Sequence, residues 1–260
     1  MTKSNRPQLR RSLGLWALIF YGVGDILGAG IYALVGKVAG VAGNASWAAF
    51  SVSLFVATLT AVTYAELGGR FPRSAGESFF SEQAFRRPWL ALLVGWVVLC
   101  SGVLSLATVS VAFGGYMSGL VPSLPQPVTV LGILLLLAVI NFRGMRESST
   151  SNIIATMVEL TGLLIVIVAG ALFLADTPDQ SVARTVEAGR SVSWTSIARG
   201  AALGFFAFIG FEDMVNVAEE VKDPERNMPR AILTALGVTG VIYLLVVDSA
   251  TSVVSPAELG

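Results

Sequence analysis

The chain has 260 residues, of which 54% are hydrophobic and 13% are charged, and its mean hydropathy is +0.74. A soluble domain needs a polar exterior, so this composition predicts a polytopic membrane protein. Seventeen basic and seventeen acidic residues balance, which leaves no polybasic surface for a nucleic acid. With no histidine and a single cysteine, Cys100, we expect no metal site, no cofactor, no intrachain disulfide and no enzymatic activity.

Seven apolar runs along the chain are long enough for membrane-spanning helices. They cover residues 13–36, 40–67, 89–121, 126–142, 150–174, 195–219 and 230–254. The basic stretch from Met1 to Arg11 resembles the start of a signal peptide, but the apolar run that follows is too long for one. We therefore expect the first run to remain as a membrane span.

Thirteen of the seventeen lysines and arginines fall in alternate connections, which is typical of cytoplasmic segments. They are Lys3, Arg6, Arg10, Arg11, Arg70, Arg73, Arg86, Arg87, Arg143, Arg146, Lys222, Arg226 and Arg230. We expect a cytoplasmic N-terminal tail at 1–12 and an extracytoplasmic loop at 176–194.

Three glycines, Gly24, Gly28 and Gly30, interrupt the first run and predict that its helix breaks near residues 28–30. Broken backbone at membrane depth needs protein or a wet cavity to receive its free N–H and C=O groups, so a break marks a binding site. One break offers carbonyls at one helix end and amides at the other, which suits a zwitterion. The alternative is that these glycines only allow close helix packing.

Asp25 and Glu159 lie within the first and fifth runs, where a carboxyl group is functional by default. Both are candidates for ion coupling, because each can gain or lose a proton as a cavity opens and closes. If the two face one another, they can share a proton or bind a small cation. The alternative for Glu159 is a permanently protonated or hydrogen-bonded structural acid.

The sixth run repeats the pattern of the first, with Gly210 placed between aromatic residues and followed by two acids. Phe208 and Phe211 flank this glycine and are expected to cover a substrate side chain, whereas Phe205 fits a packing position better. Glu212 and Asp213 are expected to lie toward an aqueous vestibule or the cytoplasmic half, because lipid exposure of a charge is costly.

Four motifs in order resemble those of amino acid permeases of the amino acid–polyamine–organocation superfamily, in particular the cationic amino acid transporter-like bacterial permeases. They are Ile26–Tyr32, Tyr64–Glu77, Asn141–Gly144, and Phe205–Phe211 together with Glu219–Ile232. The resemblance implies an all-α bundle of the leucine-transporter type, in which two inverted five-helix repeats each begin with a helix interrupted at the midplane. The first repeat is then 13–175, and 195–260 begins the second.

Relatives of this kind have about twelve spans, so the resemblance implies that the second repeat is incomplete. The sequence is then part of a longer permease, or a fragment that does not transport alone.

The resemblance also implies a site for an amino acid between the two interrupted helices. Expected substrate-binding residues are Ile26, Gly28, Ala29, Gly30, Ile31, Phe205, Phe208, Ile209, Gly210 and Phe211. Gly28 to Ile31 are expected to bind the substrate carboxylate, and the carbonyls of Phe208 to Gly210 its amino group. A cytoplasmic gate is expected at Glu66, Arg70, Glu219 and Glu220.

In function, the resemblance implies an alternating-access carrier of a plasma or bacterial inner membrane, coupled to protons, less often to sodium, or exchanging one amino acid for another. Proton-coupled relatives often carry a lysine at the position of Glu159, and neutral residues are usual at Asp25, so the coupling ion stays open. A seven-helix receptor is the alternative, but it gives no reason for glycine breaks five spans apart.

Overall fold

The computed structural model describes residues 11–28, 30–74, 76–142, 145–176 and 193–259. Within these residues the chain is helical apart from short turns and one isolated β-bridge, between Leu13 and Val221, so the all-α prediction is confirmed. The elements are α1 (Leu15–Leu27), α2 (Gly30–Ala42), η1 (Gly43–Ala45), α3 (Ser46–Arg70), α4 (Gly76–Phe85), α5 (Pro88–Leu120), α6 (Gln126–Phe142), α7 (Met145–Asp176), α9 (Trp194–Phe208), η2 (Asp213–Glu220), α10 (Pro224–Val253) and α11 (Pro256–Leu259).

Five helical stretches of the described chain are long and apolar enough to cross a membrane, and α1 and α6 are shorter apolar helices. The predicted boundary between the first two runs is wrong, because α2 continues to Ala42 and α3 begins at Ser46. The turn lies at Gly43, whose φ of 59° favours glycine. Asn44 and Ser46 follow it closely, so the local signal for the turn is the Gly-Asn pair rather than the length of the apolar run.

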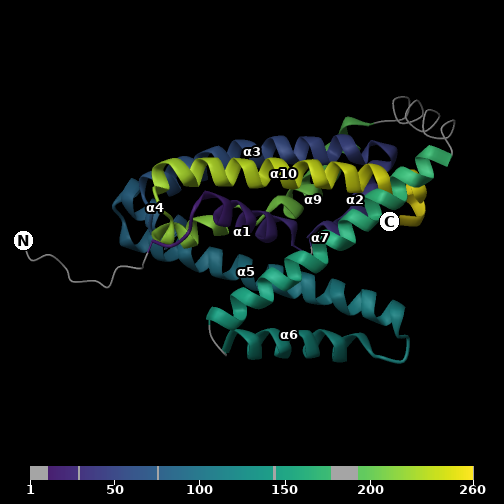
Figure 1. The fold of residues 1–260 in the computed structure, drawn as a ribbon, viewed down its shortest axis with the longest axis horizontal. Coiled ribbons are helices and arrows are strands. Elements are labelled where there is room, and N and C mark those ends of the chain that lie inside the picture. Colours follow the sequence, from purple (N-terminus) through teal and green to yellow (C-terminus); the bar gives the residue numbers. More distant parts are fainter. Residues whose placement is uncertain (1–10, 29, 75, 143–144, 177–192, 260) are drawn as a thin grey trace, which may run out of the picture.

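The packed centre of the bundle consists of α1, α2, α3, α9 and α10, with α10 against α3 and α1, and α9 against α3 and α2. Figure 1 shows α3 and α10 side by side along the long axis of the molecule. Small residues at every fourth position of α3 are buried and let neighbouring helices approach closely. They are Ala49, Ser53, Ala57, Ala61 and Ala65.

The helices α5 and α6 lie at the periphery of the bundle (Figure 1) and expose many apolar side chains. Leu92 and Leu104 of α5 are 76% and 67% exposed, and Phe142 at the end of α6 is 94% exposed. Apolar surface of this extent needs lipid or further protein to cover it. The exposed apolar side chains of α5 and α6 are therefore typical of a membrane protein, whose outer helices contact lipid or further protein.

Candidate substrate site at the two helix breaks

The first apolar run is interrupted where the glycines predict it. Helix α1 ends at Leu27 and α2 begins at Gly30. Gly28 between them has a φ of 32°, a conformation that L side chains rarely adopt. Ala29, predicted to bind substrate, lies outside the described residues. Because α2 starts here, its first N–H groups have no partner within the helix and point toward the break.

The sixth run is interrupted in the same way. Helix α9 ends at Phe208, Ile209 is extended, and Gly210 has a φ of 135° that only glycine adopts easily. The chain resumes as the 3₁₀-helix η2 at Asp213. The amide of Gly210 donates to the Glu212 carboxylate at 2.7 Å, so a side chain replaces one of the lost backbone bonds.

The two breaks touch each other through their backbones. A Cβ atom on Gly210 would lie 2.6 Å from the carbonyl oxygen of Asp25 and 3.0 Å from the Cα of Ile26. A Cβ atom on Gly30 would lie 3.1 Å from the Cα of Ala207 on α9. Glycine at these positions lets two segments, about 180 residues apart in sequence, bring their backbone dipoles to one place.

A tyrosine of α10 holds the carbonyl end of the first break. The Tyr243 hydroxyl lies 2.7 Å from the carbonyl oxygen of Ile26 and 2.5 Å from that of Leu27, and it is the donor to both. These carbonyls end α1 and have lost their helical partners. Tyr243 is fully buried, so its hydroxyl satisfies acceptors that water does not reach.

The aromatic residues of the sixth run are packed rather than free. Phe208 is fully buried, with its ring centroid 6.3 Å from that of Phe50 and 5.2 Å from that of Tyr243. Phe211 packs edge-on against Tyr64, at 5.7 Å between centroids.

The other apolar residues predicted to bind substrate differ in burial. Ile26 and Ile31 are buried, whereas Phe205 and Ile209 are partly exposed. The substrate-contact role of all these side chains stays a prediction.

Two carboxyl groups that act electrostatically on Asp25 belong to the second broken helix. Asp213 and Glu212 are close enough to interact electrostatically with Asp25, and Glu77 of α4 is close enough to interact with both of them. Neither of the two ion pairs found among the described residues includes any of these four acids. One oxygen of Asp25, Oδ2, is buried without a hydrogen-bond partner. The site therefore carries an excess of acidic groups.

The pairing of Asp25 with Glu159 is not formed. Helix α7 meets α1 one turn before Glu159, where a Cβ atom on Gly24 would lie 2.5 Å from the Thr156 hydroxyl. Glu159 itself lies beside the start of α2, and its carbonyl accepts a 2.9 Å hydrogen bond from the Tyr32 hydroxyl. Its carboxyl oxygen Oε1 is buried without a partner. Glu159 is therefore a separate acidic group beside the first break.

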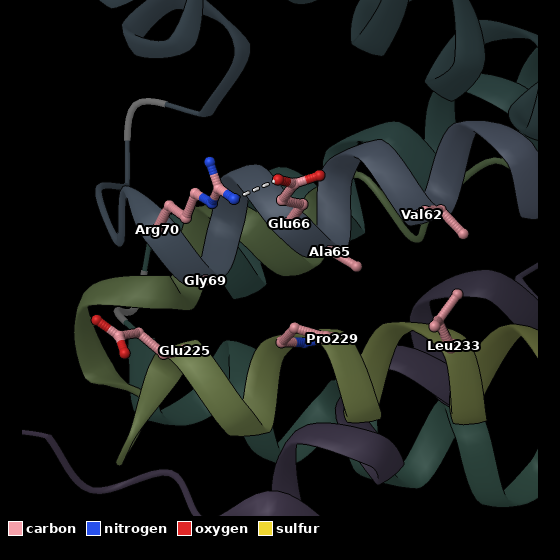
Figure 2. A pocket seen from close by; sticks show the side chains of 8 residues that line it. All are labelled: Val62, Ala65, Glu66, Gly69, Arg70, Glu225, Pro229 and Leu233. Atoms are coloured by element: carbon pink, nitrogen blue, oxygen red, sulfur yellow. Dashed lines mark ion pairs between the residues drawn. The ribbon is translucent and has the colours of Figure 1, made fainter.

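The predicted gate residues form different contacts from one another. Arg70 pairs with Glu66 at 2.7 Å within α3, as Figure 2 shows, so this pair joins no second helix. Glu219 of η2 lies 3.8 Å from Arg73, the arginine that follows α3. Glu220 acts through its backbone carbonyl, which accepts the N–H groups of residues 12 and 13 at 2.9 Å each. The cytoplasmic gate stays a prediction. Arg73, through its ion pair with Glu219, connects the segment after α3 to η2.

Sequence reasoning missed Tyr243 and Arg73. The signal for Tyr243 is that it is the only tyrosine of the apolar seventh run, and a tyrosine hydroxyl needs a hydrogen-bond partner when it is buried. Arg73 lies in the same motif as Arg70, and only the packed structure distinguishes them.

Comparison with known proteins identifies the family. The amino acid permease family model matches residues 13–260. The chain belongs to the amino acid permease family. It is therefore an integral membrane protein, as its apolar helices also indicate.

Relatives with this similarity carry transporter names. The chain is 31% identical over 254 residues to the inner membrane transport protein YbaT of Escherichia coli, covering 96% of this chain and 57% of YbaT. It is 28% identical over 275 residues to the branched-chain amino acid permease BcaP of Bacillus subtilis, covering 98% and 57%. It is 32% identical over 259 residues to human cationic amino acid transporter 4, covering 92% and 40%. The chain thus spans about half the length of these relatives.

Proposed function

We propose that this chain forms the substrate-binding part of a secondary active transporter that moves amino acids by alternating access. The observation that carries the proposal is the contact between two glycine-opened breaks, at Gly28 and Gly210, in a member of the amino acid permease family. Amide groups at the start of α2 suit a carboxylate, and backbone carbonyls after α9 suit an ammonium group.

The acidic groups around the first break support a finer proposal for the transported species. Asp25, Glu212 and Asp213 lie close together without an ion-pair partner in the described part of the chain. Such a group favours a substrate with an additional positive charge, or a proton carried by one of the acids. Glu159, with one carboxyl oxygen unpartnered, is the second proton candidate.

Binding and uptake of labelled arginine, alanine and glutamate test the proposal in vesicles with an imposed pH gradient. Gly28→Leu places a large side chain at a φ of 32° and is expected to abolish binding while the protein still inserts. Gly132→Leu is the matched control, because nothing lies within 4 Å of a Cβ atom there. Normal binding by the Gly28 variant contradicts the proposed site. If the unmodified chain binds an amino acid but does not take it up, the chain by itself is not a complete carrier.

A further inference from the structure

A groove runs between α3 and α10, where α3 ends and α10 begins (Figure 2). Its volume of about 410 Å³ falls in the range of roughly 300–1,000 Å³ usual for small-molecule sites. None of its lining residues belongs to either helix break. The lining consists of Val62, Ala65, Glu66, Gly69, Arg70, Glu225, Pro229 and Leu233.

The groove changes from apolar to charged along its length. Val62 and Leu233, at one end, are 48% and 39% exposed, and Glu225 lies at the other end beside the last turn of α3 (Figure 2). Leu233 and Glu225 are eight residues apart on α10, which corresponds to about 12 Å. The order of apolar and charged lining residues matches the order of hydrocarbon and head groups from the middle of a bilayer to its surface.

A second hollow, of about 370 Å³, continues from the charged end and shares Gly69, Arg70 and Glu225 with the groove. It adds two arginines, Arg11 and Arg226, and one more acid, Asp223. Arg70 is already paired with Glu66 at 2.7 Å. Among the described residues, no ion pair involves Arg11, Arg226, Asp223 or Glu225. Two guanidinium groups and two carboxylates thus face one hollow without neutralising each other.

We propose that the groove and the second hollow form one binding site for a phospholipid whose head group carries a phosphate and a primary ammonium. An acyl chain lies against Val62 and Leu233. The phosphate binds Arg11 and Arg226, since guanidinium groups present paired N–H donors to phosphate oxygens. The ammonium group binds the carboxylates of Asp223 and Glu225.

Charge balance favours this head group over an anionic one. The arginines Arg11, Arg70 and Arg226 meet an equal number of acids in the two hollows, namely Glu66, Asp223 and Glu225. An anionic head group would leave two carboxylates facing it without compensation. The proposal does not depend on transport activity.

Native mass spectrometry of the purified chain, titrated with three phospholipids, tests the site. We expect phosphatidylethanolamine to bind more tightly than phosphatidylcholine, whose ammonium has no N–H donors, and than anionic phosphatidylglycerol. Leu233→Trp fills the groove and should abolish this preference. Leu245→Trp is the matched control, because Leu245 is on the same helix, is 47% exposed and does not line the groove.

A second variant tests the head-group contact without touching the groove. Arg226→Gln should weaken phosphatidylethanolamine binding about fivefold, equivalent to about 1 kcal/mol for one basic side chain near a phosphate. Equal binding of phosphatidylglycerol and phosphatidylethanolamine overturns the proposed head group. Equal effects of the Leu233 and Leu245 variants, or no retained lipid at all, overturn the site.

Discussion

Tyr243→Phe tests whether the hydroxyl of Tyr243 stabilises the first helix break. The variant keeps the ring that packs against Phe50 and Phe208 and removes only the donor to Ile26 and Leu27. A buried acceptor left without a partner costs about 1–3 kcal/mol. For a protein of this size, the melting temperature should fall by roughly 2–12 °C.

Thermal unfolding in detergent, followed by fluorescence of the five tryptophans, measures this effect. Tyr116→Phe is the matched control, because the exposed Tyr116 donates its hydroxyl to the backbone carbonyl of Tyr32, which lies within the continuous helix α2. Hydrogen exchange around Gly28 should also become faster in the Tyr243 variant only. Equal melting temperatures for the two variants would refute the role assigned to Tyr243.

Three further variants probe the site. Gly210→Ala should abolish substrate binding, because its Cβ would lie 2.6 Å from the Asp25 carbonyl oxygen. Gly237→Ala is the control: its Cβ meets open space, so the variant should stabilise helix α10 by about 0.5–1 kcal/mol in the melting assay described for Tyr243. Glu159→Gln should flatten the pH dependence of uptake, and an unchanged profile removes that acid from coupling. Asp25→Asn should reduce arginine uptake relative to alanine uptake by about tenfold or more, since a charged hydrogen bond contributes about 1.5–3 kcal/mol; an unaltered ratio argues against a cationic substrate at Asp25.

Both helix breaks could be predicted because their signal is local. Gly28 and Gly210 stand inside apolar runs, and their φ values of 32° and 135° are the conformations that glycine alone adopts easily. The turn at Gly43 was missed because the boundary between the first two spans was placed by the length of the apolar runs. Asn44 and Ser46 after Gly43 are polar turn residues, but Gly36 and Gly40 nearby remain within α2, so a glycine alone does not mark the end of that helix.

The partners of the charged and polar groups could not be predicted from the sequence. Asp25 interacts with Asp213 and Glu212 rather than with Glu159, and Glu219 pairs with Arg73, which was not among the predicted gate residues. Each of these partners was visible in the sequence as a residue of the right type. Which of them meet depends on how far each helix is rotated and shifted against its neighbours.

Hydropathy, glycine placement and motif order in the chain thus determine an all-α membrane protein of the amino acid permease family with interrupted first and sixth spans. These properties follow from one segment at a time, since a backbone in lipid must satisfy its own hydrogen bonds. The packing of α10 against α1 places the Tyr243 hydroxyl on the Ile26 and Leu27 carbonyls, and the meeting of the two breaks gathers the acids beside them. Such contacts join residues up to 217 positions apart, and the simultaneous close packing of several helices sets them.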